Sequence, residues 1–451
     1  MGVPARLFIV VLTSLVALPA VAQAPPPDTP APAEAPAARR FRLGAEIKAN
    51  FRHTDDESFL DPFPFPPSFF PPGQNQIFEQ TVSPGSSLEV SNVAVIGEAD
   101  FTPDIAARAE IHFLDLYSRN PTSSDDLVAV REAWIRFGKK FEALEAAPGT
   151  TVYALVGRAP RFTKQRLRRL ESYGLWGTAV GRFEENQVEV GGSAGKSVYW
   201  RAQVASPNPL FMRDTNALAG DNGTPQNVPG SVDPIYHSGF PIFYDAKPSD
   251  LNATGKVQVG FGLGWRRPRA PGKLSFDALG WYFHRTLADR ARIRGTFYGG
   301  DILLLKGVFF PLPYEGRNKS EYGLNVEAEH RGLRAFAQYI RQDIAKLDRH
   351  GLEVELAYVF DLPGLFASGD SPVVNWIQPV VRFSQITNDF VVNPQYPAPS
   401  VGWNWKKYDF GIRLGIVRGL DLTAEYSRHD VKTEGPKLHP DELLVTVRAG
   451  F

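Results

Sequence analysis

Apolar and polar residues alternate along much of the chain with a period of two. In residues 41–52 ("FRLGAEIKANFR"), every second side chain from Phe41 to Phe51 is apolar, and the residues between them are glycine, polar or charged. An ordinary soluble strand has about five or six residues, whereas about ten tilted residues cross a bilayer. The pattern therefore predicts a long strand with one lipid-facing surface and one surface facing a wet interior.

The same alternation recurs to the end of the chain. We predict strands at 41–52, 87–101, 105–117, 127–138, 151–158, 182–193, 197–206, 255–266, 273–286, 320–330, 334–343, 351–361, 374–386, 405–417, 420–430 and 441–451. An even number of strands is typical of a bacterial barrel. The predicted fold is therefore all-β, a transmembrane antiparallel up-and-down β-barrel of 16 strands, or 18 if residues 298–306 ("YGGDILLLK") hide a further pair.

The predicted connections alternate between short turns and long loops, as they do in outer-membrane barrels. The short turns are 102–104, 193–196, 267–272, 331–333 and 418–421, and the long loops are 53–86, 207–254, 287–319 and 387–404. Both ends of the barrel segment would then lie on the periplasmic side. In this arrangement, residues 159–181 form the third external loop.

The last predicted strand ends on an aromatic residue. In "LLVTVRAGF" (443–451), Leu443, Val445, Val447, Ala449 and Phe451 share one face. In a barrel this strand closes against the first one. A terminal aromatic in such a strand resembles the C-terminal signal that the barrel-assembly machinery recognises in bacterial outer-membrane proteins. We therefore predict Phe451 as the assembly signal.

The first forty residues have the pattern of an export signal and a linker. Arg6 precedes an apolar run at 7–21 ("LFIVVLTSLVALPAV"), and small residues allow cleavage after Ala22 or Ala24. This run is short for a membrane anchor, which is the alternative. We predict a signal peptide at 1–22, a Pro/Ala-rich linker at 23–40 and the barrel at 41–451, exported to a bacterial outer membrane.

Composition excludes several other functions. The 49 basic and 49 acidic residues balance, which argues against a nucleic-acid partner. The chain has no cysteine, so it has no disulfide framework and no thiol chemistry. Its 40 glycines and 38 prolines suit many strands joined by turns.

One stretch of the chain concentrates positive charge. Within "RAPRFTKQRLRR", residues 158–169 carry six basic side chains and no acid. The general porins fold their third loop into the barrel as a constriction, and arginines there would attract phosphate, sulfate or carboxylate groups. We predict an anion-binding set of Arg158, Arg161, Lys164, Arg166, Arg168, Arg169 and the nearby Arg182. The alternative is a solvated loop that binds lipopolysaccharide phosphates at the rim.

Three further arginines are predicted to face the lumen from the strands: Arg108, Arg136 and Arg201. Glu110, Glu132 and Glu184 lie near them in the strand pattern. A wall of mixed charge with a transverse field is therefore an equal possibility.

A resemblance to a known family covers part of the first third of the chain. The stretches "VAVIGEADFTPDIAARAEIHFLD" (93–115), "VREAWIRFG" (130–138) and "YALVGRAPRFTKQRL" (153–167) resemble the phosphate-selective porin O and P group of outer-membrane porins. The resemblance implies a sixteen-stranded, homotrimeric porin. This chain uses arginines and lacks the lysine ladder of strict phosphate channels, so the resemblance does not identify the solute.

Other motifs favour structure over chemistry. "GFGLG" (260–264) lies inside a predicted strand, unlike a dinucleotide-binding turn. "DTNALAGDNG" (214–223) has oxygen ligands for calcium without EF-hand spacing. "YSRHD" (426–430) and "HSGF" (237–240) are candidate serine–histidine sites of a hydrolase.

These observations together predict a passive diffusion channel for small hydrophilic solutes, with no catalysis, cofactor or metal. The expected partners are membrane lipid, lipopolysaccharide, small anionic or polar solutes, the barrel-assembly machinery and further copies of the chain. Two alternatives remain, an outer-membrane hydrolase and a non-conducting adhesion or structural barrel plugged by residues 207–254.

Overall fold

A computed structural model gives the structure of the chain. It describes residues 40–55, 58–62, 76–80, 85–115, 128–140, 144, 149–163, 165, 169–176, 184–206, 210–211, 242–244, 257–286, 292–294, 300–301, 316–344, 346–368, 371–390, 404–432 and 437–451. The chain divides into two compact units, Met1–Ala38 and Arg39–Phe451, and every described residue belongs to the second. No helix within the described ranges is long and apolar enough to span a membrane.

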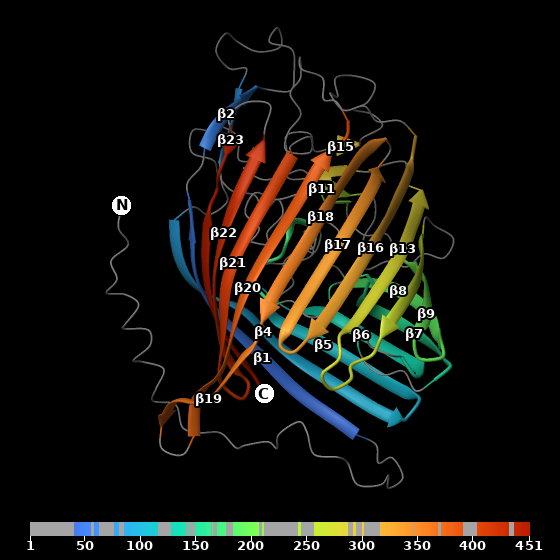
Figure 1. Ribbon diagram of the computed structural model, residues 1–451. Coiled ribbons are helices and arrows are strands. Elements are labelled where there is room, and N and C mark those ends of the chain that lie inside the picture. Colours follow the sequence, from blue (N-terminus) through green and yellow to red (C-terminus); the bar gives the residue numbers. More distant parts are fainter. Residues whose placement is uncertain are drawn as a thin grey trace. The chain divides into compact units, whose positions relative to one another are not determined.

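Sixteen strands pair antiparallel, each with two neighbours, and close into one ring (Figure 1). Strand β1 pairs with both β4 and β24, which closes the barrel. In ring order the strands are β1 (Arg40–Thr54), β4 (Gly85–Thr102), β5 (Ile105–Asp115), β6 (Ala129–Gly138), β7 (Thr151–Pro160), β8 (Glu184–Ala194), β9 (Val198–Ala205), β12 (Gln258–Arg267), β13 (Ser275–Thr286), β16 (Asn318–His330), β17 (Leu333–Ile344), β18 (Leu347–Tyr358), β20 (Ser371–Asn388), β21 (Asn404–Val417), β22 (Leu420–Lys432) and β24 (Glu442–Gly450). The predicted all-β barrel of sixteen strands is confirmed.

The remaining strands do not enlarge the ring. A small separate sheet contains β10 (Leu210–Phe211), β11 (Ile242–Tyr244), β14 (Arg292–Arg294) and β15 (Gly300–Asp301), and β2 (Ser58–Pro62) pairs only with β3 (Gln76–Gln80). Strand β19 (Phe360–Ser368) pairs with the start of β20, and β23 (Lys437–Leu438) pairs with the end of β22. Of residues 298–306 the structure describes Gly300–Asp301, which form β15 outside the ring. The described ring has 16 strands and not the alternative 18.

Seven connections between neighbouring strands of the ring lie at the same end of the barrel, which we call the turn end. The β16–β17 connection is one of its two-residue turns. His330 pairs with Leu333, and the two residues between them, Arg331 and Gly332, both have positive φ (46° and 83°). This backbone fits the type I′ turn that matches the twist of a hairpin.

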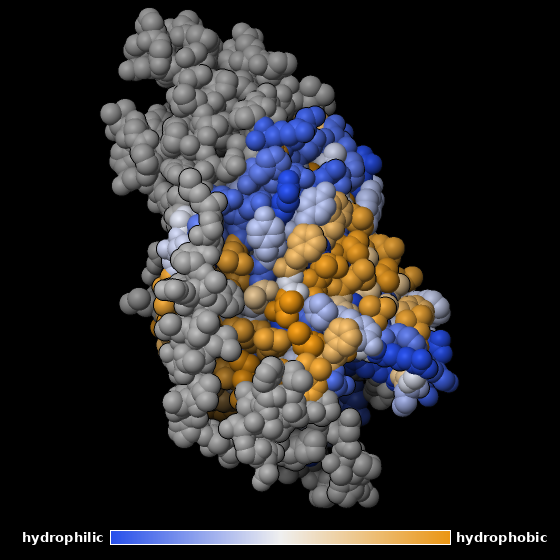
Figure 2. All heavy atoms as spheres, turned by 60° about the vertical axis from the view of Figure 1, so that its left-hand side comes forward, coloured by the Kyte–Doolittle hydropathy of each residue, from blue (hydrophilic) through white to orange (hydrophobic). Residues whose placement is uncertain are grey.

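The barrel has an apolar outer surface and a polar inner one. On β1, Phe41 and Leu43 are 71% and 68% exposed and point outward. On the opposite faces of the strands, charged side chains such as Asp409 and Glu425 are buried. Figure 2 shows the outer apolar side chains gathered in a band with hydrophilic residues on either side. A period of two produces both surfaces from one strand.

Aromatic rings lie against glycines on the inner wall. A Cβ added to Gly264 would overlap the ring of Tyr199, and one added to Gly260 would overlap Phe283. Each glycine therefore leaves room for a ring on the neighbouring strand to lie flat on the wall. This packing keeps large side chains close to the wall of the barrel.

Candidate pore constriction

The segment that follows β7 crosses the interior of the barrel. We call residues 161–176 the inward segment, of which 161–163, 165 and 169–176 are described. It leaves the wall at β7, and its far end contacts Arg382, Ser384 and Gln385 of β20. Strands β7 and β20 are eight places apart in the ring of sixteen. The segment therefore reaches the wall opposite its origin, where the third loop was expected to fold inward.

The near end of the inward segment is fixed by Arg161. Its Nη2 donates to Glu321 at 2.8 Å, and its Nε lies 3.7 Å from Glu185. The guanidinium also lies 3.9 Å from the centre of the Phe283 ring, on which Phe162 stacks. Two carboxylates and one ring face neutralise and hold this cation. Arg161 is thus an anchor of the segment to the wall.

The middle of the segment is held by Glu355 of β18. This carboxylate accepts hydrogen bonds from Arg169 Nη1 at 2.8 Å and from Gln165 Nε2 at 3.2 Å. Leu170 packs against Gly411 of β21, where an added Cβ would overlap its Cδ2. The basic side chain of Arg169 therefore also has a carboxylate partner.

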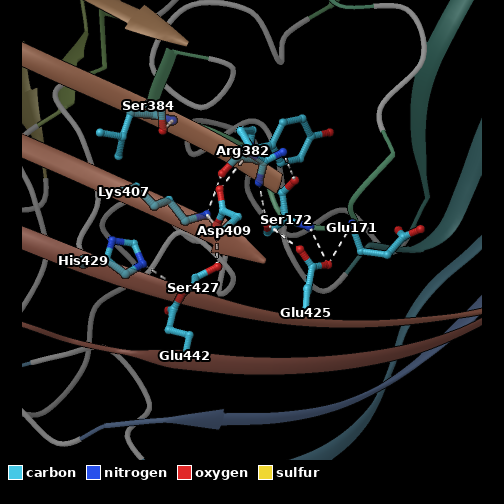
Figure 3. Close-up of polar contacts among 12 residues, drawn as sticks. Glu171, Ser172, Arg382, Ser384, Lys407, Asp409, Glu425, Ser427, His429 and Glu442 are labelled. Carbon is cyan, nitrogen blue, oxygen red and sulfur yellow. Dashed lines mark hydrogen bonds and ion pairs between the residues drawn. The ribbon is translucent and has the colours of Figure 1, made fainter. Parts of the chain in front are cut away.

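The far end of the segment is held at Ser172, and we call this group of contacts the Ser172 anchor (Figure 3). The carboxylate of Glu425 accepts hydrogen bonds from the backbone N–H of Glu171 (2.8 Å), the backbone N–H of Ser172 (3.0 Å) and the Ser172 hydroxyl (2.7 Å). Arg382 donates to the Ser172 carbonyl (3.0 Å) and to its hydroxyl oxygen (2.6 Å). Both wall residues are buried.

Asp409 orients the cations of this anchor. It accepts from Arg382 Nε at 2.8 Å and lies 3.0 Å from Lys407 Nζ. Lys407 in turn donates to the carbonyl of Tyr173 at 2.8 Å. Hydrogen bonds to charged groups are the strong ones when water is excluded. The far end is therefore held by a connected charged network.

Trp176 completes the attachment. Its backbone N–H donates to Glu353 at 3.2 Å, and its ring Nε1 donates to the carbonyl of Gln385 at 2.8 Å. The ring lies over Gly351 of β18, where an added Cβ would overlap Nε1. The side chain of Trp176 is fully buried.

The predicted anion-binding residues fall into three groups. Arg161 and Arg169 form the ion pairs described above. Arg158 is half-buried on β7 and lies opposite Ala133 and Asn186 in the ladders. Lys164, Arg166, Arg168 and Arg182 lie outside the described residues.

The three predicted wall arginines are not equivalent. Arg108 has three carboxylates around it, Glu98 (2.5 Å), Glu110 (2.8 Å) and Glu132 (3.1 Å). Arg201 is buried and lies 4.0 Å from Glu189, which replaces the expected neighbour Glu184.

Arg136 is half-buried on β6, opposite Ala106 and Leu155. Together with the carboxylates around Arg108, these positions make the described wall one of mixed charge.

The residues that attach the far and middle parts of the inward segment were not among those predicted. These are Ser172 and Trp176 in the segment, and Glu353, Glu355, Arg382, Lys407, Asp409 and Glu425 on the wall. For the six wall residues, a position on the polar face of an alternating strand was the available signal. That signal marks a side chain as inward-facing and does not indicate what it meets.

The serine–histidine candidate at 426–430 is not arranged for nucleophilic catalysis. The hydroxyl of Ser427 donates to Asp409 at 2.5 Å. The two ring nitrogens of His429 face Trp405 Nε1 (3.1 Å) and Glu442 (3.4 Å). A nucleophilic serine needs a hydrogen bond to the base, and Ser427 uses its proton elsewhere. The second candidate, at 237–240, lies outside the described residues.

The other motifs have local explanations. Gly260–Gly264 lie within β12, so "GFGLG" is part of a strand. Within the described ranges, no group of three or more His, Asp or Glu side chains could hold a metal ion. The calcium candidate at 214–223 lies outside the described residues.

No known protein-family model matches the chain, and no curated protein matches it. Solved structures are similar to it. OprB of Pseudomonas putida is similar with a TM-score of 0.50 and 11% identity, over 91% of this chain and 94% of that one. The outer membrane channel DcaP of Acinetobacter baumannii has a TM-score of 0.48 and 10% identity, over 92% and 97% of the two chains. OmpT, an outer membrane protein of Vibrio cholerae, has a TM-score of 0.47 and 9% identity over 92% and 100%.

The likeness to OprB shows that the two chains share a barrel fold. It does not single out the phosphate-selective porin O and P group, and no family model supports that narrower assignment.

Proposed function

We propose that this chain is an outer-membrane porin, a passive diffusion channel for small hydrophilic solutes. The observation that carries the proposal is the inward segment, which crosses a closed barrel from β7 to β20. A barrel of sixteen strands is wide enough for an aqueous channel. A segment fixed across it would narrow the channel and determine which solutes pass. The apolar outer band supports a position in a bilayer.

The proposed location is the bacterial outer membrane, reached through removal of residues 1–22. In the proposed assembly, Phe451 is recognised by the barrel-assembly machinery and three copies form a homotrimer. Lipid surrounds the apolar band, and lipopolysaccharide lies at the end opposite the turns. The proposed activity needs no cofactor and involves no catalysis.

Anion preference is the finer part of the proposal, for phosphate-like or carboxylate solutes. It is supported by the run of basic residues at 158–169. The carboxylate partners of Arg161 and Arg169 reduce what these two contribute. The preference would therefore come mainly from Lys164, Arg166, Arg168 and Arg182 in the same stretch.

The experiment that tests the proposal is conductance of the purified protein in a planar bilayer under a KCl gradient. We expect discrete conductance steps and an anion-selective reversal potential. A triple charge reversal of Arg166, Arg168 and Arg169 to Glu should move the reversal potential towards cation selectivity, because it changes the charge at the constriction.

The matched control reverses three exposed cations at the turn end, Lys139, Arg267 and Arg331. It changes the net charge equally and should move the potential less. Cation selectivity of the unchanged protein would support the channel proposal and would contradict an anion preference set by these arginines.

A non-conducting barrel is the second candidate, and one observation favours it. Several charged side chains on the inner wall, among them Glu355, Lys407 and Asp409, have no exposed surface. A filled interior would produce such burial. Absence of conductance from a correctly folded barrel would support this candidate against the porin.

A further inference from the structure

The turn end of the barrel carries a concentration of exposed positive charge. In the described connections and adjoining strand ends, nine Lys and Arg side chains are exposed, whereas the exposed acids are Asp104 and Asp361. The whole chain has a formal net charge of zero. The positive charge is therefore a local property of this end.

Six of these cations have no salt bridge. Arg42 and Arg269 pair with Glu98 and Glu329. Within the described part of the chain, the following six form no ion pair with a carboxylate: Arg40, Lys139, Lys196, Arg267, Lys273 and Arg331. They come from the start of β1, from the end of β12 and from four different connections, β6–β7, β8–β9, β12–β13 and β16–β17. We call them the turn-end cations.

Each turn-end cation lies next to the apolar band. Within two residues of each there is an exposed apolar side chain, and the six are Phe41, Phe137, Val198, Trp265, Leu274 and Leu333. Arg267 shares the outer face of β12 with Trp265, whose ring packs against Phe276. A long basic side chain beside the edge of an apolar band places its charge at the depth of lipid headgroups.

We propose that the turn-end cations bind anionic phospholipid headgroups. The inference rests on the proposed outer-membrane function, in which the turns face the phospholipid leaflet on the periplasmic side. Basic residues beside a membrane attract anionic lipid, and the attraction falls off within a Debye length. A ring of such residues would enrich phosphatidylglycerol or cardiolipin around this end of the barrel. Lipid, rather than a soluble polyanion, is favoured because each cation adjoins an outward apolar residue.

The test uses the absence of cysteine in the chain. An Ala194→Cys substitution at the exposed end of β8 carries a fluorophore two residues from Lys196. The labelled barrel is inserted in phosphatidylcholine vesicles that contain a small fraction of nitroxide-labelled lipid. Nitroxide-labelled phosphatidylglycerol should quench the fluorophore on the order of fivefold more effectively than the phosphatidylcholine analogue, and high salt should remove the difference.

Two variants locate the effect. Changing the six turn-end cations to Gln should remove most of the preference for phosphatidylglycerol. Exchanging Arg for Lys and Lys for Arg at the same six positions should retain it, because the charge is unchanged. Equal quenching by both lipids would overturn the proposal, as would an unchanged preference in the Gln variant.

Other outcomes separate this inference from the proposed function. Binding of soluble peptidoglycan fragments without a lipid preference would overturn the lipid assignment in favour of a cell-wall contact. A lipid preference in a barrel that conducts no ions would support binding of anionic lipid and contradict the proposed porin function. Failure of the folded protein to insert in the vesicles would overturn both.

Discussion

Glu425 is one of the wall residues that hold the far end of the inward segment. Its carboxylate accepts three hydrogen bonds from Glu171 and Ser172. It is buried, so no water replaces a partner that is lost. The carbonyl and hydroxyl oxygens of Ser172 also accept hydrogen bonds from Arg382. One serine therefore ties the segment to two wall strands, β20 and β22.

A Glu425→Gln substitution keeps the shape of the side chain and removes its charge. We expect the free energy of unfolding to fall by about 1–3 kcal/mol, because charge-assisted hydrogen bonds become neutral ones. Hydrogen exchange at the Ser172 amide should accelerate, and chemical denaturation in vesicles should measure the stability. The matched control is Glu98→Gln, which removes a carboxylate that binds Arg42 and Arg108. Unchanged exchange at Ser172 in a folded Glu425→Gln barrel would contradict the anchor.

Gly351 provides the second test at the scale of residues. An added methyl group would overlap both Trp176 Nε1 and the Gln385 carbonyl that it binds. We expect Gly351→Ala to displace the indole, to cost about 1–3 kcal/mol of stability and to change the single-channel conductance. Gly97→Ala is the control, since nothing lies within 4 Å of its added Cβ. Identical conductance of the two variants would exclude Trp176 as part of the constriction.

At the scale of elements, closure of β24 on β1 decides whether a barrel forms. The pairing runs from Glu46 opposite Gly450 to Thr54 opposite Glu442. Beyond it, Ala45 and Phe451 exchange two backbone hydrogen bonds of 2.7 Å and 3.1 Å. Phe451 itself is 78% exposed. Backbone and ring are therefore available for different tasks, closure and recognition.

Deletion of Phe451 should lower the yield of folded barrel, because it removes the closing bonds and the proposed assembly signal together. Phe451→Ala keeps the backbone bonds and should separate the two effects. Heat-modifiable gel mobility of cell-derived membranes measures the folded fraction. Phe41→Ala, another exposed phenylalanine at the same end, is the control. Normal assembly of Phe451→Ala would show that the deletion acts through loss of the closing backbone bonds and not through loss of an assembly signal.

All sixteen ring strands were predicted from the alternation of residues, and most boundaries agree within about three residues. Strand β18 is an exception, since it begins at Leu347, not at residue 351. Its first residues, Leu347–His350, include three polar side chains and do not alternate. Ile344 pairs with Leu347 there, and Lys346, with a φ of 73°, donates its N–H to Asp343.

Strand β19 was also missed. Residues 362–373 contain Pro363, Gly364 and Pro372, which predict a loop. In the structure β19 (Phe360–Ser368) pairs with the start of β20, outside the ring, with an irregular register between Asp361 and Leu365. Pro363 is tolerated in β19 because, among the described strands, β19 pairs with β20 alone and so is an edge. Local propensity could not show that a partner strand was available.

At the scale of the whole molecule, the barrel combines an apolar outer band with a charged interior and basic turn-end positions. We expect the protein to form a homotrimer in its membrane. Native mass spectrometry of the detergent-solubilised protein should give three times the mass of one chain, and heating should give the single chain. A single-chain mass in several mild detergents would contradict the trimer and leave the channel proposal intact.

The sequence alone determined the strands, their faces and their closure into a barrel. These follow from a period of two and from the need to pair every backbone group in a membrane. The tertiary structure alone decided which inward side chains meet. Ser172 and Glu425 are 253 residues apart in sequence, yet their side chains lie within 2.7 Å. Alternation assigns a residue to a face, whereas its partner across the lumen depends on the register of the whole ring and the path of the inward segment.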